Sequence, residues 1–519
     1  MSAFARLVHA EWTKFRTVRG WLIGMAAAAA AIVGLGLFPG MEGTCGSGCG
    51  LPVGPGGEEV TDVFTFVHRP LAGDGTITVR VASLTGELPP DGPGKEPQPG
   101  LVPWAKAGLI VRSGTKQGAT YAAVMVTGAH GVRLQHDYVH DRAGKPGAVT
   151  ESAPRWLRLT RAGDVVTALE SADGTSWTGV GTVRLKDLPA TAEVGLFVTS
   201  PMFVEGIGAA GASSAPSLAT AGFDHLTTTG GWQSATWTTE RIGGTADEHP
   251  IGSGPPPGPA PGDASGGSRA PAGGQAPGAE QTGDGFTVSG SGDIAPAVAG
   301  AAGLGTTISQ TLVGTFAGLV FVVVVGAMTM TGEYRRGLIR TSLAAAPRRG
   351  AALAAKATVL GAVTFVVGVA AAAVVVTIGP GLLRDNGVYV HPVSTATELR
   401  VIAGTGALLA VAAVLALAFG VLLRRGTTAV TLAFVATVLP YLLSMTVLPV
   451  AAGAWLLRVT PAAAFAIQQS TPQYAQVEGL YTPANGFFPL TPWSGLAVLL
   501  AWATVGLAFA AYRFRRRDV

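Results

Sequence analysis

The sequence predicts an α-helical polytopic membrane protein of six transmembrane helices that carries one inserted all-β domain. Long apolar runs without a charge lie near both ends of the 519-residue chain, whereas residues 60–249 consist of short alternating segments separated by turn residues. Hydrophobic residues make up 48% of the chain and charged residues only 13%. A soluble protein of this size needs more charge on its surface, so the composition also favours a membrane protein with a polar insert.

The apolar runs set the expected membrane spans. Residues 308–330 and 357–378 are uncharged for 23 and 22 residues, and each is long enough to cross a hydrocarbon layer as a helix. Apolar pieces between residues 451 and 492 predict re-entrant or interfacial helices. In the membrane part, residues 306–519, the expected spans are 308–330, 357–378, 401–423, 427–450 and 493–512.

Residues 1–40 are expected to form an amphipathic elbow helix followed by the first span, at residues 21–38. In the elbow, apolar residues from Phe4 to Val18 lie near one helix face, with Lys14 and Arg16 largely away from it. A signal peptide is the alternative for this stretch. The long lead containing Glu11 and the lack of a small-residue cleavage pattern after Phe38 favour an uncleaved helix.

Basic residues sort to one side of these spans. Four precede Trp21, six lie in residues 331–356, two are Arg424 and Arg425, and four end the chain, against three in the short loops of the other side. The positive-inside rule then predicts a multi-pass plasma-membrane protein with cytoplasmic termini and an extracytoplasmic β domain. Residues 41–305 hold 16 Lys and Arg against 25 Asp and Glu, so the net charge of +4 reflects topology and predicts no nucleic-acid partner.

The polar insert divides by composition. Residues 41–59 are a Gly-rich connector, 60–249 the β domain, 250–285 a Gly/Pro-rich linker, and 286–305 either a returning strand or a membrane-proximal stalk. Ala162-Gly163-Asp164 and Asp173-Gly174 are expected hairpin turns. Cys45 and Cys49 are spaced C-x3-C between glycines, and a disulfide and two free thiols are equally open alternatives. A metal site is not expected here, because the sequence has no second Cys or His pair nearby.

Catalytic motifs are missing from the sequence. It contains no P-loop, nucleophile elbow or H-E-x-x-H, and no Asp, Glu, Lys or Arg within the apolar runs, which disfavours ion-coupled transport. We therefore expect no enzymatic activity, cofactor or metal in this chain. His136 to Asp141 is the one cluster that a metal could use, and a solvated strand and turn is the favoured alternative. Trp104, Trp156 and Trp177 could stack on sugars, although such residues more often support a core.

The β domain resembles the concanavalin-type lectin and glucanase sandwich over about residues 61–226. The resemblance depends on A-G-L-I-V-R at 107–112, W-L-R-L-T-R-A-G-D at 156–164, S-A-D-G-T-S-W-T-G-V-G at 171–181 and V-G-L-F-V-T-S at 194–200. It implies a fold more than a ligand.

The membrane part resembles the type-2 ABC exporter permeases. The resemblance depends on E-Y-R-R-G-L-I-R-T-S-L-A-A-A-P-R-R-G-A-A-L-A-A-K at 333–356, on the elbow H-A-E-W-T-K-F-R-T-V-R-G-W at 9–21 and on the R-R-R-D tail. Leu338 stands where many members have Thr. The resemblance implies that residues 333–356 dock into a separate ATP-hydrolysing subunit and transmit its motion. The implied coupling residues are Glu333, Tyr334, Arg335, Arg336, Gly337, Arg340, Pro347, Arg348 and Lys356, and those of the elbow are Glu11, Lys14 and Arg16.

The resulting expectation is the membrane subunit of an ABC exporter, active as a homodimer or with a second permease, and in contact with membrane lipid and an ABC ATPase. The basic residues of 333–356 could instead only fix topology and touch lipid headgroups, and the two roles are compatible. A membrane-anchored carbohydrate-binding or glycan-hydrolysing protein is the alternative function, but five further helices exceed what an anchor needs.

Overall fold

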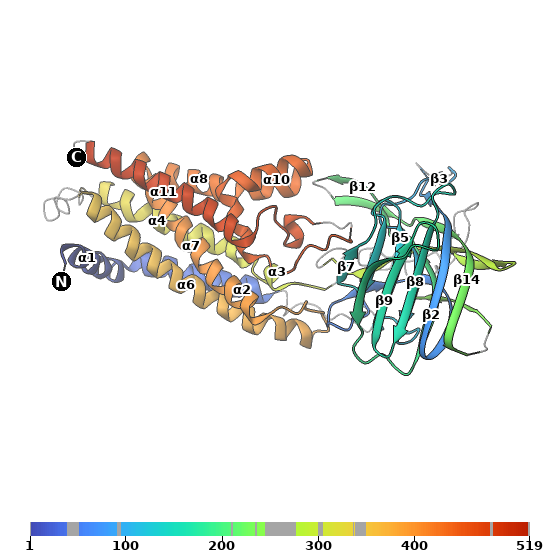
Figure 1. Cartoon of the computed structure of the whole chain (residues 1–519). Coiled ribbons are helices and arrows are strands. Elements are labelled where there is room, and N and C mark those ends of the chain that lie inside the picture. Colours follow the sequence, from blue (N-terminus) through green and yellow to red (C-terminus); the bar gives the residue numbers. More distant parts are fainter. Residues whose placement is uncertain are drawn as a thin grey trace, which may run out of the picture.

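The computed structural model describes residues 2–38, 51–90, 95–208, 211–233, 236–243, 277–298, 305–335, 337, 349–477 and 481–516. The described helices form one elongated bundle, and the described strands form a β domain at one end of it (Figure 1). The N- and C-terminal ends both lie at the other end of the bundle. The molecule therefore has a helix end and a β end, and the long helices run between them.

Five described helices are long and apolar enough to span a membrane, and a bent pair could supply a sixth span. The five are α2 (Arg19–Leu37), α4 (Gly314–Arg335), α6 (Arg349–Asp385), α7 (Thr395–Leu423) and α11 (Pro492–Arg516). Shorter helices are α1 (Ala3–Thr17), α3 (Ile308–Thr311), α8 (Gly426–Thr437), α9 (Leu439–Thr446), α10 (Val450–Val459), η3 (Pro461–Gln468) and η4 (Pro483–Asn485).

The span expected at 427–450 is not one continuous helix. It consists of α8 and α9, which meet at Val438 with a bend of 43°. Pro440 lies in the first turn of α9, where its ring and missing N–H interrupt the helical hydrogen bonds of the preceding turn. The expected span at 427–450 therefore stays a prediction, to which the structure adds a break, because hydropathy measures apolar length and does not detect a bend.

Helices α4 and α7 form the centre of the bundle. In each, 67% of the most apolar window is buried within the chain, against 22% for α2 and α11. Close approach of α4 and α7 requires glycine: a Cβ on Gly326 would lie 2.4 Å from the Ala413 carbonyl oxygen, and one on Gly420 would lie 2.8 Å from that of Ala327. The peripheral helices α2 and α11 leave large apolar side chains such as Ile23 and Val505 exposed, as expected of surfaces that face lipid or another subunit.

The β domain is built around β2 (Phe64–Leu88), a strand of 25 residues. Its first part pairs with β11 and β15, and its second part pairs with β8 and β14. Because β4 and β5 also contact β8, the sheet closes into two layers that share β2 (Figure 1). The apolar side chains between the layers, including Val67, Leu109 and Leu159, are buried. We call this two-layered unit the sandwich.

The remaining strands follow the turn-rich sequence. They are β1 (Val60–Asp62), β3 (Gln98–Pro99), β4 (Lys106–Arg112), β5 (Tyr121–Thr127), β6 (Val132–His136), β7 (His140–Ala143), β8 (Arg155–Ala162), β9 (Val165–Ser171), β10 (Thr178–Arg184), β11 (Thr191–Thr199), β12 (Phe203–Gly208), β13 (Gly211–Ala215), β14 (Leu218–Trp232), β15 (Thr238–Ile242), β16 (Gly278–Thr282), β17 (Gly285–Gly290) and β18 (Ile294–Pro296). Gly163, at φ 64°, turns the chain between β8 and β9.

The predicted linker, 250–285, extends too far. Its last residues form β16, which pairs with β17 in a hairpin that joins β14. Gly283, at φ 62°, makes the turn, so a glycine counted as linker composition serves a hairpin. Strand β17 and the short β18, which pairs with β1, bring residues 285–296 back to the sandwich. For this stretch the structure shows the returning strand and not a stalk.

Candidate coupling site and the base of the sandwich

A network of four charged side chains lies toward the helix end of the bundle. Lys356, near the start of α6, places its Nζ 2.8 Å from Glu11 Oε2 of α1 and 2.8 Å from Glu333 Oε1 of α4. Lys14 Nζ of α1 also forms an ion pair with Glu333 Oε1. We call Glu11, Lys14, Glu333 and Lys356 the charge network. It joins three helices that are far apart in the sequence.

The charge network is neutral as a whole and largely shielded from solvent. Glu333 is 5% exposed and Lys356 is 7% exposed, whereas the side chains of Lys14 and Glu11 reach 28% and 18% exposure. Two acids and two bases alternate, and Glu333 accepts from both lysines. Buried charges are tolerated when they are paired in this way, and removing one partner leaves the others buried without enough opposite charge. The positions of α1, α4 and α6 are therefore energetically linked.

Apolar packing surrounds the network. A small cavity beside it is lined by Glu11, Phe15, Trp21 and Lys356, among others. The rings of Phe15 and Trp21 pack at a centroid distance of 5.6 Å where α1 gives way to α2. Phe15 is buried, so the elbow helix is held to the bundle by an aromatic contact as well as by charge.

Several sequence-predicted residues lie around this site. Tyr334 places its ring 5.0 Å from the guanidinium carbon of Arg424, the residue that ends α7 in a left-handed conformation. Arg335 is exposed at the end of α4, and Gly337, at φ 69°, follows it. Arg16 is exposed on α1. The predicted residues that fall outside the described part of the chain are Arg336, Arg340, Pro347, Arg348, Cys45 and Cys49.

One expectation about the elbow needs correction. Lys14 was expected to point away from the apolar face of its helix with Arg16, but it turns toward the bundle and pairs with Glu333. The reason is that the Glu333 carboxylate supplies a negative charge inside the apolar surroundings, and this ion pair compensates for the partial burial of the lysine. The sequence placed these residues in two separate groups and did not predict that they meet.

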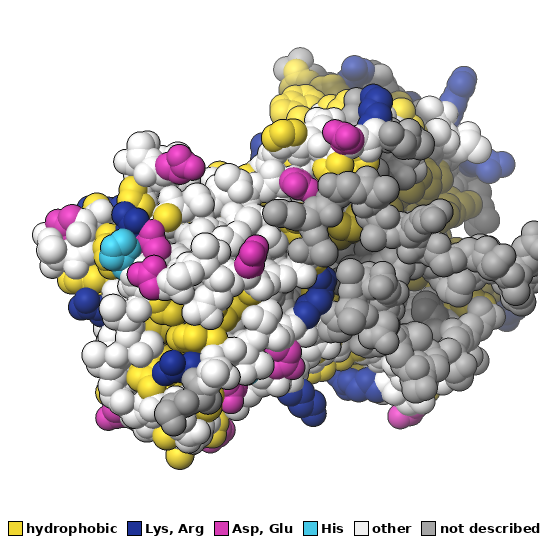
Figure 2. Space-filling model, turned by 90° about the vertical axis from the view of Figure 1, so that its right-hand side faces the viewer, with side chains coloured by type: hydrophobic (Ala, Val, Ile, Leu, Met, Phe, Trp, Pro, Cys, Tyr) yellow, Lys and Arg dark blue, Asp and Glu magenta, His cyan; other side chains and the backbone are white. Residues whose placement is uncertain are grey.

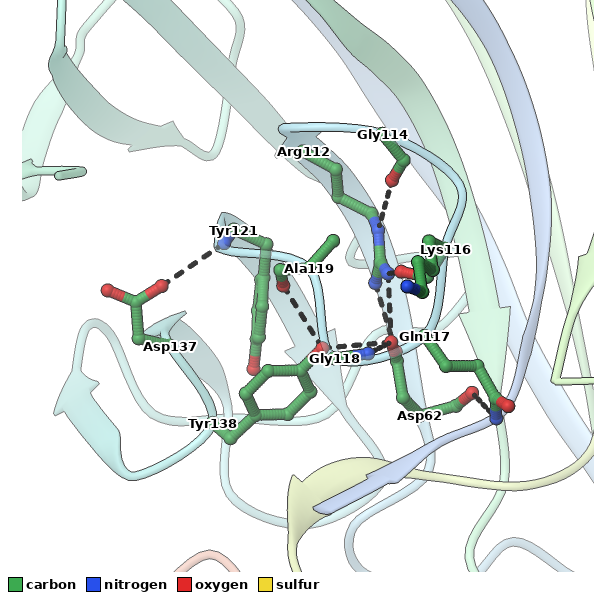
Figure 3. Close-up of polar contacts among 10 residues, drawn as sticks. All are labelled: Asp62, Arg112, Gly114, Lys116, Gln117, Gly118, Ala119, Tyr121, Asp137 and Tyr138. Carbon is green, nitrogen blue, oxygen red and sulfur yellow. Dashed lines mark hydrogen bonds and ion pairs between the residues drawn. The ribbon is translucent and has the colours of Figure 1, made fainter. Parts of the chain in front are cut away.

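A second polar cluster lies inside the sandwich (Figure 3). Its Tyr138 belongs to the turn that Gln476, from the helical part of the chain, contacts. Asp62 of β1 is fully buried and accepts two hydrogen bonds from Arg112 of β4, at 2.9 and 2.8 Å. It also accepts from the Tyr138 hydroxyl at 2.8 Å and from the Gly118 amide at 3.0 Å. Arg112 and Tyr138 are fully buried too. Four donor contacts to one carboxylate make this a saturated structural ion pair.

The segment from His136 to Asp141 contains the turn that supplies Tyr138. The alternation expected of a strand breaks here, because Asp137 and Tyr138 adopt φ of 45° and 62°. Tyr138 therefore points inward to Asp62, while His136 and His140 pair across β6 and β7 with stacked rings 4.3 Å apart. No group of three His, Cys, Asp or Glu side chains arranged to hold a metal is found among the described residues.

The tryptophans considered for sugar stacking have other contacts. Trp104 is buried and stacks on His130, and Arg158 lies 3.8 Å from the centre of the Trp177 ring. Trp156 meets His225 edge to face. Figure 2 views the molecule from the sandwich end, and the charged side chains on the described part of this face lie scattered, without a broad basic region.

The family comparison covers the helices from α3 to α11 and part of the sandwich. Residues 191–519, more than half of the chain, match the family model described as "ABC-2 family transporter protein". The chain belongs to the ABC-2 transporter family. It is therefore the membrane permease component of an ABC transporter and pairs with an ABC ATPase. Within this permease, Glu333 and Lys356 fall inside the matched range, while Glu11 and Lys14 precede it.

Other comparisons give no further identity. No curated protein matches the permease. Similar solved structures include a functionally unknown protein from Saccharomyces cerevisiae, with 16% identity over 31% of this chain and 72% of that chain and a TM-score of 0.19. Scytalido-glutamic peptidase gives 9% identity over 44% and 98%, with a TM-score of 0.24. Sheep galectin-11 gives 15% identity over 25% and 89%, with a TM-score of 0.14. Scores this low do not establish a shared fold, so the concanavalin-type resemblance stays a prediction.

Proposed function

We propose that the permease exports its substrate with energy from ATP hydrolysis in a separate subunit, and that the charge network transmits the motion. The observation that carries this proposal is the contact of Lys356 and Lys14 with Glu333. Helices α4 and α6 flank residues 336–348, the segment whose sequence resembles a coupling segment, and the network ties both helices to α1. A push on that segment would therefore move three helices together.

The proposed orientation puts the network in the cytoplasm and the sandwich outside the cell. It is supported by the 16 basic residues assigned to one side against three on the other, and by the location of both chain ends away from the sandwich (Figure 1). The described residues of one chain supply five or six candidate spans, so we propose that the permease works as a homodimer or with a second permease. Family membership favours this role over a membrane-anchored glycan-binding protein.

Charge reversal within the network tests the proposal. We expect Glu333→Lys to abolish ATP-driven export while leaving the protein inserted in the membrane, because three lysines would then face one carboxylate. Arg340→Glu, in the segment expected to meet the ATPase, should have the same effect. The measurements are co-purification of an ABC ATPase with the tagged full-length chain, and export activity of the complex in lipid vesicles.

Arg458→Glu is the matched control. This charge reversal lies on the exposed side of α10, far from the network in sequence, and should leave export unchanged. Full export by the Glu333→Lys complex would show that the network does not transmit the motion. Failure of any ATPase to co-purify with the native chain would contradict the partner assignment itself.

A further inference from the structure

The connection between α6 and α7, residues 386–394, contacts both the segment that enters α3 and the base of the sandwich. The His391 amide donates to the Thr306 carbonyl oxygen at 3.0 Å, and the Thr306 amide donates to that of Tyr389 at 2.8 Å. The Tyr389 hydroxyl donates to the carbonyl oxygen of Gly57, in the segment that leads into β1. Further along the chain, Gln476 donates to the Tyr138 and Val139 carbonyl oxygens, each at 3.2 Å. We call this contact region the junction.

A carboxyl group and an imidazole are buried together in the junction. Glu59 is 1% exposed and His391 is 6% exposed, and His391 Nε2 lies 3.6 Å from Glu59 Oε2. Among the described residues, neither Glu59 carboxyl oxygen has a hydrogen bond of ordinary geometry, and neither does His391 Nε2. The backbones of both residues are held, since the Ala297 amide donates to the Glu59 carbonyl oxygen at 2.9 Å.

Burying a single unpaired charge in the junction is energetically unfavourable. A buried carboxylate without partners is strongly disfavoured, and so is a buried imidazolium. The favourable states are the neutral pair and the ion pair, and in each of them the two side chains hold one proton between them. Burial raises the pKa of Glu59 to about 7, against a weaker opposing effect of the Leu51 amide, and burial lowers the pKa of His391 to about 4. Both values favour the neutral pair.

We propose that Glu59 and His391 act as a proton-compensated pair, which keeps the sandwich docked on the α6–α7 connection with a strength that does not change with pH. The proposal does not depend on export or on the charge network. It assigns a role to a side-chain pair that the coupling mechanism does not use, and it concerns a surface between two parts of this chain.

The two groups act in opposite directions when the junction opens. An exposed Glu59 would return toward a pKa of 4.5, so its raised value in the junction favours docking at low pH and loses that effect as pH rises toward 7. An exposed His391 would return toward 6.5, so its lowered value favours docking above pH 6.5 and loses that effect as pH falls toward 4. Over the shared range the two dependences cancel.

Other titratable groups face the pair. Burial raises the pKa of Glu58, with a further contribution from the charge of Asp137 in the β6–β7 turn. Burial also raises the pKa of Tyr389 to about 12, so its hydroxyl stays neutral, and it raises the pKa of Tyr474. These groups are the same in every variant of Glu59 and His391 described below. Differences between the variants therefore report Glu59 and His391 alone.

Hydrogen exchange on the full-length chain in lipid nanodiscs tests the proposal. Peptides that contain Thr306 and His391 give the junction opening equilibrium after correction for the chemical exchange rate at each pH. In the native chain we expect this equilibrium to change by no more than about twofold between pH 5 and 7. In Glu59→Gln only the histidine remains, so opening should increase roughly tenfold or more from pH 7 to 5. In His391→Gln it should increase by a similar factor from pH 5 to 7.

In the double variant, Glu59→Gln with His391→Gln, the junction opening equilibrium should be as independent of pH as in the native chain, although its absolute value can differ. Tyr389→Phe is a matched control that removes a hydrogen bond without a group that titrates in this range, so it should shift opening equally at every pH. Protection of β5 shows whether the sandwich stays folded, and if a glutamine variant unfolds, Glu59→Leu and His391→Phe replace it. The proposal would be overturned if the opening equilibrium did not change with pH in either single variant, or if it changed steeply with pH in the native chain.

Discussion

Two buried ion clusters in the described part of the chain differ in what they join. In the sandwich, Asp62 and Arg112 come from strands of one folded unit, and four donor contacts converge on a single carboxylate. In the bundle, the charge network joins three helices through lysine ammonium groups, each at the end of a long flexible side chain. The first cluster is enclosed on all sides, whereas the second borders a small cavity and the partly exposed Glu11 and Lys14.

The difference shows how similar chemistry suits two tasks. The planar guanidinium of Arg112 matches its carboxylate in a bidentate geometry, which fixes one arrangement of the strands. Lysine ammonium groups accept several geometries at little cost, so helices joined by them can shift while the ions stay paired. We therefore expect damage to the Asp62 cluster to lower stability, and damage to the charge network to lower transport by a folded protein.

The largest effect on stability is expected from Asp62→Ala. The variant leaves the Arg112 guanidinium buried without its counter-ion, and breaking a buried pair in this way costs about 3–5 kcal/mol. Chemical denaturation of the full-length permease in detergent, followed by the near-ultraviolet signal of the sandwich tyrosines, measures the loss.

Asp164→Ala is the control for that experiment. Asp164 pairs with Arg184 at 2.6 Å, but the two side chains are 44% and 71% exposed. An exposed pair contributes about 0–1 kcal/mol, so this variant should unfold close to the native midpoint. Equal losses in the two variants would remove the distinction between an enclosed and an exposed ion pair on which the comparison depends.

A smaller change in stability, with a larger one in transport, is expected from Lys14→Gln. The variant removes one of the two cations on Glu333 and keeps the other, so about 1.5–3 kcal/mol of charged hydrogen bonding is at stake, reduced by the partial exposure of Lys14. Because the described ion pairs would then link α1 to α4 through Glu11 and Lys356 alone, we expect export to fall several-fold. Initial export rates per inserted molecule measure this.

Arg16→Gln makes the matched comparison, since it removes an exposed basic residue from the same turn of α1. Its effect on stability should stay within about 0.5 kcal/mol, with export unchanged. If both substitutions reduce export equally, the basic face of α1 acts through lipid headgroups or the ATPase and not through the charge network.

Much of the architecture follows from the sequence because each part obeys a local rule. A membrane demands about 20 uncharged residues per span, and that demand is visible in 308–330 and 357–378. Alternation and turn residues marked the strands that the structure shows as β4, β5, β8 and β9. The family was recognisable from residues 333–356, because that segment combines an acid, a Gly-Leu-Ile-Arg run and a later lysine.

What sequence reasoning missed is non-local. Glu11 and Lys356 are 345 positions apart, and no local pattern states that their side chains meet. Strand β16 lay hidden in Gly- and Pro-rich sequence because its pairing partner, β17, decides its conformation. Glu59 and His391 gave no signal at all, since an acid in a connector and a histidine in a loop are ordinary until burial brings them together.

The smallest effect is expected where the sandwich and bundle meet through neutral groups. Gln476→Ala removes two hydrogen bonds, to the Tyr138 and Val139 carbonyl oxygens, and neutral bonds contribute about 0.5–1.5 kcal/mol each. Water can reach part of this loop, so we expect about 1 kcal/mol in the junction opening equilibrium and no change in sandwich unfolding. Hydrogen exchange of peptides around Tyr138 measures the first and denaturation the second. A loss comparable to that of Asp62→Ala would mean that the Asp62 cluster owes its stability to contact with the helices, and the two ion clusters would then belong to one cooperative unit.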